Sequence, residues 1–339
     1  MIQRTLGKTG LNVSVVGFGG IPIQRLEEDK AVSLVKLSIE KGMNFIDTAR
    51  AYGQSEKMIG LAIENANMRK KCYIATKSTS RDYESMKKDI ETSLRNLKCD
   101  VIDLYQCHLV KTQEQFDQIL SPNGAYPALK EAQEAGLIKN IGITSHDYNI
   151  LDMALDTKYF STIQFPYNIV ERQGEALFEK AAKKNIGVII MKPLAGGALD
   201  DGDLALKFIL NNNNISVVIP GMDSEQQVIE NSKVGKETSI LTVEERQKLE
   251  KIQKELSSNF CRRCGYCLPC PQNIDIPSAF LMEGYYSRYN LKNWALERYN
   301  ALPNKASECI KCGKCEPNCP YDLPIREMLK DVVEKLEAN

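Results

Sequence analysis

Four polar side chains in the first third of the chain have the chemistry needed to reduce a carbonyl group. Asp47, Lys77 and His108 each end an apolar, β-branched run, and Tyr52 follows Asp47 by five residues. A Tyr phenol can give a proton to the carbonyl oxygen if a nearby Lys cation stabilises the phenolate and lowers the phenol pKa from its usual value of about 10. An Asp can hold that cation, and a His can orient the oxygen, so the four are candidate catalytic groups.

Each of these residues also has an ordinary structural explanation. Asp47 could cap the next turn, Lys77 could be a solvated strand end, and His108 could be a core histidine whose hydrogen bonds are satisfied. Their joint occurrence at strand ends or in the adjoining loop favours the catalytic interpretation over three separate coincidences.

Eight of the 11 cysteines fall into two short runs after residue 260. The runs are Cys261, Cys264, Cys267 and Cys270, then Pro271, and Cys309, Cys312, Cys315 and Cys319, then Pro320. The second run has the C-x₂-C-x₂-C-x₃-C-P spacing of bacterial ferredoxins, and the first is one residue shorter before its last cysteine. Two four-cysteine zinc sites are the alternative, but paired runs with trailing prolines favour two [4Fe–4S] clusters. Cys72, Cys99 and Cys107 are expected to be small core residues.

Composition narrows the class of protein. Lys+Arg and Asp+Glu both number 44, so the formal charge is zero, which argues against nucleic acid or a membrane surface as a partner. The first residues lack a signal-peptide pattern, and no apolar run has membrane-spanning length. We therefore expect a cytoplasmic protein, in which reduced cysteines bind metal rather than form disulfides.

The elements that must position these residues follow a repeating pattern. Longer amphipathic stretches separate eight short apolar runs, which are VSVVGFGG, NFID, CYIATK, IDLYQCH, IKNIGITS, STIQFPYN, IGVIIMKP and ISVVIPGM. The runs lack polar/apolar alternation, as in parallel strands buried on both faces. Eight strand–helix units predict a closed (β/α)₈ TIM barrel, whose chemistry lies at the carboxyl ends of its strands. A doubly wound open sheet is the alternative, but no GxGxxG follows the first run.

Helix signals accompany the runs. We expect one helix to end at Gly42, one to open at Ser55 and one at Ser85. A polar helix is expected over 244–257, an aromatic-rich helical insert over 277–302, and a last helix after Pro324. The cysteine distribution divides the chain into a barrel domain, 1–257, and a small, mainly α-helical ferredoxin-like domain, 258–339.

The segments GMNFIDTARAYGQSE, YIATK and IDLYQCH resemble signatures of the aldo-keto reductase family. RTLGKTGLNVSVVGFGG resembles the opening segment of that family, a hairpin that plugs the barrel bottom followed by the first strand. The resemblance spans roughly residues 2 to 235. It implies NAD(P)H as hydride donor, Tyr52 as general acid/base, Lys77 as the group that tunes it, Asp47 as the partner of the lysine, and His108 as the substrate-orienting donor.

The resemblance also implies a set of nicotinamide-binding residues. Ser145 and Gln164 match positions that hold the carboxamide, and Met191 stands where many members stack an aromatic ring on the nicotinamide. Lys192 stands where members of the family commonly have a Ser. Leu194, in the same segment, is the last expected nicotinamide-binding residue of this group.

The loop at 219–231 resembles the segment that closes over the adenosine phosphate. Glu230 and Asn231 match its adenine-contacting end, but Gly221 and Gln227 stand where several members carry a Lys and an Arg for the 2′-phosphate. A 2′-phosphate needs cationic donors, so both NADH and NADPH stay open as cofactors. An ordinary strand-to-helix turn is the alternative for this loop.

The long insert between the cysteine runs resembles α-helical ferredoxin domains with two clusters. In such ferredoxins the fourth cysteine of each run crosses to the other cluster. The resemblance implies one cluster held by Cys261, Cys264, Cys267 and Cys319, and a second held by Cys309, Cys312, Cys315 and Cys270.

Three functions remain after the sequence analysis. The first is an enzyme that reduces a small-molecule carbonyl, with clusters that relay electrons, sense redox state or stiffen the fold. The second is an electron-transfer protein coupled to a flavin or a redox partner protein, although no flavin motif is present. The third is a nicotinamide-sensing subunit with a vestigial site. The sequence does not identify the substrate.

Overall fold

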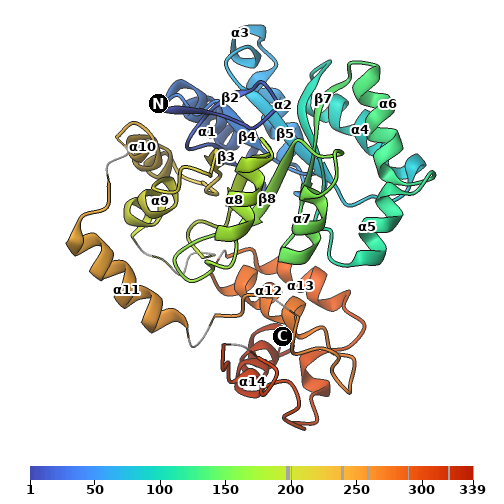
Figure 1. Ribbon diagram of the computed structural model, residues 1–339, viewed down its shortest axis with the longest axis vertical. Helices are drawn as coiled ribbons and strands as arrows, with labels where there is room; N and C mark the ends of the chain where they lie inside the picture. The colour runs from blue at the N-terminus through green and yellow to red at the C-terminus, as the bar shows by residue number, and fades with distance from the viewer. Residues whose placement is uncertain are drawn as a thin grey trace. The chain divides into compact units, whose positions relative to one another are not determined.

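The computed structural model describes residues 1–195, 199, 201–237, 240–257, 260–263, 265–288, 290–319 and 321–338. These residues form two compact units (Figure 1). The first unit comprises Met1–Asn168, Arg172–Pro193 and Asp201–Leu241, and the second comprises Ile169–Glu171, Leu194–Asp200 and Thr242–Asn339. This division groups residues 242–257 with the second unit, whereas the sequence pattern places a domain boundary after 257; that boundary stays a prediction.

The first unit is built on eight parallel strands in chain order. They are β3 (Phe18–Gly19), β4 (Phe45–Asp47), β5 (Tyr73–Ser78), β6 (Ile102–Cys107), β7 (Ile138–Thr144), β8 (Thr162–Pro166), β9 (Gly187–Met191) and β10 (Val217–Val218). Parallel bridges between Val16 and Val218 and between Gly19 and Gly221 join the first strand to the last. The predicted (β/α)₈ barrel is confirmed, and its strands are buried on both faces as the absence of alternation indicated.

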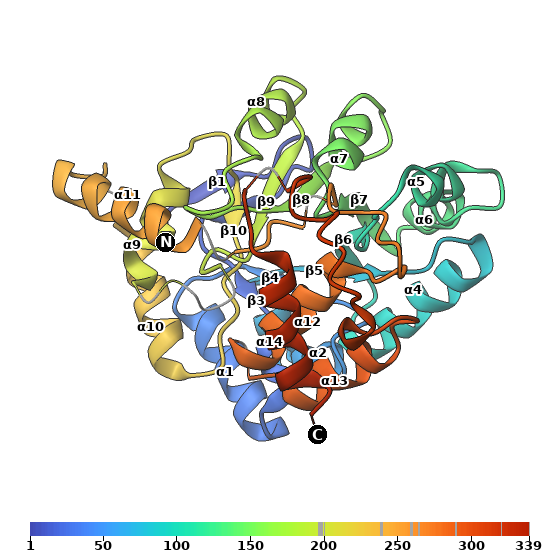
Figure 2. The same ribbon diagram turned by 90° about the horizontal axis from the view of Figure 1, so that it is seen from below.

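Helices cover the outside of these strands (Figure 2). They are the 3₁₀ turn η1 (Pro22–Arg25), α1 (Glu28–Glu40), α2 (Ser55–Ile63), α3 (Ala66–Arg69), α4 (Tyr83–Leu97), α5 (Gln113–Leu120), α6 (Ala125–Glu134), α7 (Tyr148–Leu155), α8 (Glu175–Lys183), α9 (Gly202–Leu210) and α10 (Glu225–Val234). The helix expected to open at Ser85 begins two residues earlier. Its N-cap is Asp82, whose carboxylate accepts a hydrogen bond from the amide of Ser85 at 2.9 Å.

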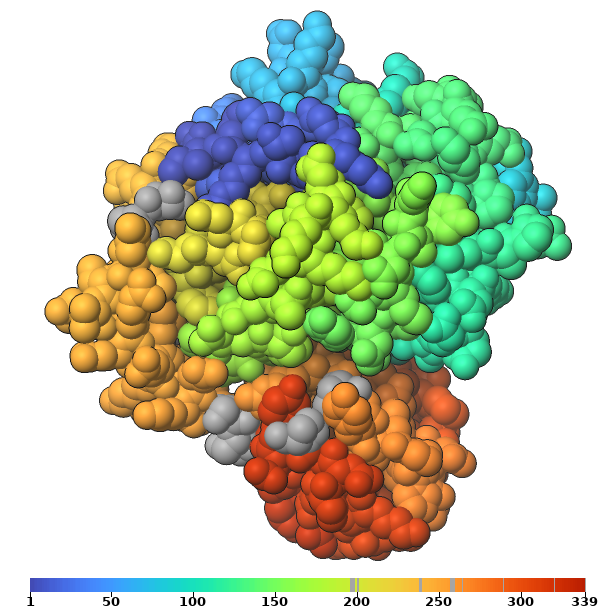
Figure 3. All heavy atoms as spheres, viewed as in Figure 1, coloured from blue at the N-terminus to red at the C-terminus, as the bar shows by residue number. Residues whose placement is uncertain are grey.

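A hairpin of β1 (Gln3–Thr5) and β2 (Asn12–Ser14) precedes the barrel. Its residues Leu6, Leu11 and Val13 belong to one buried cluster with inward-facing strand residues such as Leu104 and Ile189. An antiparallel bridge joins Gly7 to Ile186 just before β9, and the N-terminal segment lies against that part of the chain in Figure 3. The hairpin therefore closes one end of the barrel, as the sequence resemblance predicts.

The second unit is helical. It contains α11 (Val243–Ser257), α12 (Ile276–Ser287), α13 (Lys292–Asn300), the 3₁₀ turn η2 (Ala306–Glu308) and α14 (Ile325–Leu336). Asp275 caps α12 through the amide of Ser278 at 3.1 Å, and Pro324 stands at the N-cap of α14. A separate core of residues such as Phe280, Tyr299 and Val332 holds these helices together.

No helix in the described part of the chain is long and apolar enough to cross a membrane.

The hairpin gives a stability prediction. Gly7 has φ of 52°, and a Cβ at this position would lie 2.2 Å from the amide nitrogen of Gly187. We expect Gly7→Ala to lower the free energy of unfolding by about 2–3 kcal/mol, because it combines backbone strain with overpacking. Gly10→Ala is the matched control: Gly10 also has positive φ, 74°, but open space around it, so about 1 kcal/mol is expected. Urea denaturation followed by circular dichroism measures the free energy of unfolding of both variants. An equal decrease in the two would contradict the close packing of the hairpin against the end of the barrel.

Candidate functional site

Three neighbouring strands bring the polar residues to one end of the barrel. Asp47 is the last residue of β4, Lys77 lies near the end of β5, and His108 follows the last residue of β6. Lys77 pairs in register with Gln106 of β6, so these side chains lie at the same level of the sheet. Tyr52 lies in the turn that precedes α2.

Asp47 and Lys77 form a buried ion pair. Nζ of Lys77 donates to Oδ1 of Asp47 at 2.6 Å and to the carbonyl oxygen of Thr48 at 2.6 Å, and both side chains are excluded from solvent. Burial raises the pKa of Asp47 and lowers the pKa of Lys77, and the charge of each partner opposes the shift of the other. The contact thus offsets part of the desolvation that disfavours the charged form of each group.

Tyr52 packs against both Lys77 and His108. The ammonium of Lys77 lies 5.0 Å from the centroid of the Tyr52 ring. The rings of Tyr52 and His108 meet edge to face, with centroids 5.7 Å apart and an interplanar angle of 84°. The structure therefore brings the four predicted catalytic residues together at one mouth of the barrel.

His108 is held in its neutral form. Burial, followed by the positive charges of Lys77 and Arg81, keeps the pKa of His108 well below its usual range. Its Nδ1 atom is buried and has no hydrogen-bond partner among the described residues. A neutral imidazole has one N–H donor and one acceptor nitrogen, so the ring has hydrogen-bonding capacity left for a ligand.

Gln106 is a site residue that the sequence analysis missed. Its Nε2 donates to Oε1 of Gln164 at 3.1 Å and lies 3.5 Å from Oδ2 of Asp47, which links the ion pair to β8. Its own Oε1 is buried without a partner among the described residues. Strand alternation could have revealed it, because residues 104, 106 and 108 face the same side of β6.

The predicted carboxamide-binding residues lie at neighbouring strand ends. Gln164 of β8 pairs in register with Thr144 of β7, and both Ser145 and Gln164 are buried. The Ser145 hydroxyl donates to the carbonyl oxygen of Val110 at 2.6 Å and accepts from the amide of Asp147 at 2.9 Å. Ser145 has therefore already used its donor, and only an acceptor position is left for a ligand. The unpartnered Gln106 oxygen and His108 nitrogen beside these residues fit a polar ligand such as a nicotinamide.

Other predicted nicotinamide residues follow β9. Met191 ends the strand and is half-buried, and Lys192 has φ of 57°. The carbonyl oxygen of Lys192 accepts from Nδ2 of Asn168 at 3.0 Å. Leu194 is half-buried and belongs to the second compact unit, so the structure does not group it with Met191.

The predicted adenosine loop leads into α10. Ser224 caps this helix, Oε1 of Gln227 accepts from the amide of Asp223 at 2.8 Å, and Asn231 is buried. Glu230 is exposed and accepts from Nε2 of Gln226 at 2.5 Å. Gly221 forms the bridge to Gly19. A cavity of about 390 Å³ lies between α1 and the start of α10, lined by Leu26, Asp29, Lys30, Ser33, Leu34, Asp223, Ser224 and Glu225.

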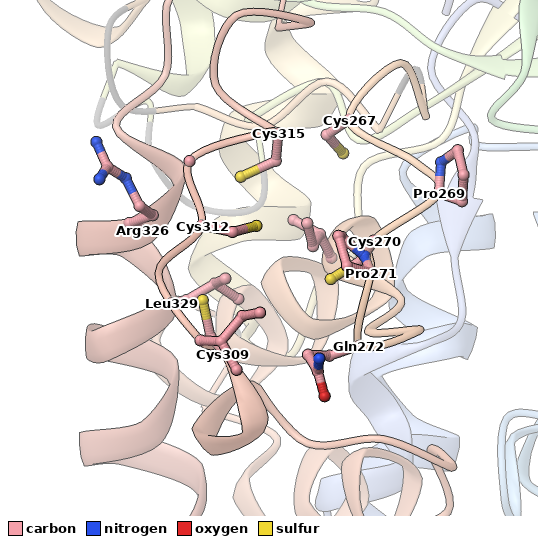
Figure 4. A pocket seen from close by; sticks show the side chains of 13 residues that line it. Cys267, Pro269, Cys270, Pro271, Gln272, Cys309, Cys312, Cys315, Arg326 and Leu329 are labelled. Atoms are coloured by element: carbon pink, nitrogen blue, oxygen red, sulfur yellow. The ribbon is translucent and has the colours of Figure 1, made fainter.

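The cysteines of the second unit surround two small pockets. Cys267, Cys270, Cys309, Cys312 and Cys315 line the first, together with apolar residues such as Ile276 and Leu329 (Figure 4). Cys261, Cys267 and Cys319 line the other, with Phe280, Leu323 and Ile325. Cys264 lies outside the described residues. The first pocket thus contains Cys270 beside the second run, and the other contains Cys319 beside the first run.

The donor set of these pockets fits iron–sulfur clusters. Thiolates are the ligands that such clusters take, and the cysteines in the described part of the chain form no disulfide. Arg326 lines the first pocket and Arg262 the other, and their cations would offset part of the negative charge of the thiolates. Within the described residues, no group of three or more His, Cys, Asp or Glu side chains is arranged to hold a single metal ion.

Both parts of the chain are similar to known protein families. Residues 15–203 match the description "Aldo/keto reductase family", and residues 260–324 match a 4Fe-4S dicluster domain. The chain is 31% identical over 277 residues to L-galactose dehydrogenase from Arabidopsis thaliana. The aligned region covers 67% of this chain and 86% of that protein. Aldo-keto reductase YhdN from Bacillus subtilis is 29% identical over 218 residues, 59% of this chain and 64% of that protein.

Solved structures give the same fold for the barrel. The holo form of an aldo-keto reductase from Bacillus halodurans superimposes with a TM-score of 0.65 at 27% sequence identity. The match covers 74% of this chain and 96% of that one.

The ion pair gives the second prediction. We expect Asp47→Asn to lower the free energy of unfolding by about 3–5 kcal/mol, because Lys77 would lose the buried carboxylate that binds its ammonium. The double variant Asp47→Asn/Lys77→Met should lose less than the two single variants added together, as measured in a double-mutant cycle by urea denaturation. Glu64→Gln, which breaks the exposed pair with Lys98 at 2.9 Å, is the control and should cost under about 1 kcal/mol. Strict additivity of the two buried changes would disprove the coupling.

Proposed function

The chain belongs to the aldo/keto reductase family and is an NAD(P)-dependent oxidoreductase, and from this premise we propose that it reduces an aldehyde or ketone to an alcohol. The convergence of Tyr52, Lys77, Asp47 and His108 at one barrel mouth is the observation that carries the proposal. Four residues with matched chemistry, two in strands and two in the segments that follow strands, are the arrangement that a proton transfer to oxygen requires.

In the proposed reaction the Tyr52 phenol donates its proton to the carbonyl oxygen. The adjacent Lys77 ammonium stabilises the phenolate that remains, and Asp47 holds the ammonium in place. Neutral His108 donates a hydrogen bond to the same oxygen and orients the carbonyl carbon. Bound NADH or NADPH would supply the hydride. Ser145 and Gln164 would hold its carboxamide, and Met191 would cover the ring.

We propose that NADH is accepted as well as NADPH. The two positions at which relatives carry cations for a 2′-phosphate are Gly221 and Gln227 here. Asp223 and Glu225 flank Ser224 at the start of α10, and Arg25 is paired with Asp223. Carboxylates at a helix N-terminus compete with a phosphate for the positive end of the helix dipole.

We propose that each cysteine pocket holds one [4Fe–4S] cluster. One would take Cys270, Cys309, Cys312 and Cys315, and the other Cys261, Cys264, Cys267 and Cys319. The pockets support this division because Cys270 lies with the second run and Cys319 with the first. The clusters would carry single electrons, for relay or for redox sensing.

An electron-transfer protein that serves a flavin or a partner protein is the second candidate. One observation favours it: Cys312 is exposed, and its neighbour Ile310 is 60% exposed, so one pocket reaches the surface beside an apolar side chain. Absence of NAD(P)H-dependent carbonyl reduction, together with cluster reduction by a flavodoxin or ferredoxin, would favour this candidate over the first.

Tyr52 gives the test of the first candidate. We expect Tyr52→Phe to lower kcat for NADH-dependent reduction of a panel of aldehydes by about 10²–10⁴-fold, because the variant has no proton to give. NADH affinity, measured by fluorescence titration, should stay within a factor of two. Tyr159→Phe, which changes an exposed ring, is the matched control and should retain full activity. Undiminished turnover in Tyr52→Phe would reject the mechanism.

Cluster assignment has its own test. Protein purified anaerobically should hold about eight irons and eight sulfides per chain, and Cys309→Ala about four of each, because one cluster loses a ligand. Iron and sulfide analysis with the visible absorption spectrum measures this. Cys99→Ala should keep the wild-type content, since Cys99 lies in the first unit. Zinc in place of iron and sulfide would refute the assignment.

A further inference from the structure

Arg81 lies in the loop between β5 and α4 and binds the backbone directly after β6. Its Nη2 donates to the carbonyl oxygen of His108 at 2.7 Å and to that of Leu109 at 3.0 Å. Leu109 has φ of 51°, a left-handed conformation that a leucine rarely adopts. The amide of Leu109 donates to Oγ1 of Thr144 at 2.8 Å. Arg81 therefore holds a strained turn, and His108 is the first residue of that turn.

The loop that carries Arg81 is itself fixed. The carbonyl oxygen of Arg81 accepts from the amide of Ala125 at 2.9 Å. The preceding residue, Ser80, donates to Oδ2 of Asp89 at 2.7 Å. The guanidinium thus acts on His108 from a rigid base, not from a mobile surface loop.

The charge of Arg81 has no carboxylate partner within the described residues. Asp89, the acid bound to its loop, is taken by the hydroxyls of Ser78 and Ser80 and by Arg50. Nη1 of Arg81 is buried and has no hydrogen-bond partner there either. A structural arginine in a partly buried position is normally paired. The charge of Arg81 instead acts on the buried thiol of Cys107 and on one group of the proposed site.

That group is His108. Its ring faces Tyr52 from the loop after β4 and Lys77 from β5, with Arg81 from the loop after β5, while Asp47 is engaged by Lys77. Among the residues that the structure describes, two cations and no free carboxylate surround the imidazole. Protonation of the ring would add a third positive charge, which these neighbours disfavour.

We propose that Arg81 is a positioning residue, which clamps the turn after β6 and keeps the imidazole of His108 aimed at the carbonyl oxygen. The catalytic part of this inference rests on the proposed carbonyl reduction. Arg81 acts through His108 and need not touch the substrate.

The chain has only two histidines, His108 and His146, which permits a direct test. Full-length, cluster-loaded protein labelled with ¹³C-histidine is titrated by NMR from pH 8 to pH 5. In wild type the His108 signal should not titrate in this range. In Arg81→Met the protonation of His108 should begin at a higher pH than in wild type, because one of the two neighbouring cations is lost, although burial and Lys77 still hold the pKa below the usual range; His146 should be unchanged. The same variant should lose about tenfold or more in kcat, with NADH affinity retained.

The variant Arg81→Lys separates the effect of the positive charge from the effect of the two hydrogen bonds that the guanidinium donates. Its His108 signal should stay untitrated, because the cation is kept, but kcat should still fall, because a lysine cannot present the planar fork. Arg95→Met is the matched control: Arg95 is exposed on α4, so neither readout should change. If Arg81→Met does not fold, Arg81→Lys decides: a reduced kcat supports the clamp, and a wild-type kcat overturns it.

Wild-type titration of His108 and wild-type kcat in folded Arg81→Met would overturn the inference. A wild-type protein that reduces no carbonyl would instead defeat the proposed function. The NMR readout then still decides whether Arg81 governs His108, so the two failures can be told apart.

Discussion

The buried ion pair between Lys77 and Asp47 is the constraint on which the rest of the site depends. Two charges removed from water are tolerated only with good geometry and further hydrogen bonds. The structure supplies both, because β4 and β5 are adjacent and parallel and the ammonium also donates to the carbonyl of Thr48. Once the ammonium is fixed at the carboxyl end of β5, the positions of Tyr52 and His108 relative to it set what the site can do.

A polar network outside the strands fixes the turn that carries Tyr52. Glu56 of α2 is buried and accepts four hydrogen bonds, from Arg50, Thr76, Ser93 and Asn96 at 2.7–3.0 Å. The amide of Arg50 in turn donates to the carbonyl of Lys77 at 2.9 Å. A fully satisfied carboxylate of this kind makes its surroundings rigid. The turn that carries the phenol is therefore tied to both β5 and α4. These contacts hold the phenol in place before a substrate binds, as a preorganised site requires.

The second compact unit, which contains both cysteine runs, is stabilised differently from the barrel. It has its own small apolar core, and cysteine side chains meet in two pockets that are otherwise lined mostly by apolar residues, with Arg326 beside one and Arg262 beside the other. A small domain has too little core to be strongly stable by hydrophobic burial alone, and bound clusters would add stability as structural metals do. Hydride transfer moves two electrons at once, whereas a cluster moves one. Electrons could therefore pass between a hydride and a cluster only if the electron pair is split into single electrons.

The sequence by itself determined the barrel, the eight strands and the spacing of both cysteine runs. These features are local or periodic: a buried parallel strand appears as an unbroken apolar run, and C-x₂-C spacing is visible along the chain. It also identified Asp47, Tyr52, Lys77 and His108 as candidates, because polar residues at strand ends stand out against the apolar runs. Tertiary structure alone showed Gln106 between Asp47 and Gln164, the engaged hydroxyl of Ser145, and the hold of Arg81 on the turn after His108. These contacts join residues 25 or more positions apart. Their partners are set by strand register and loop path, which no local pattern encodes.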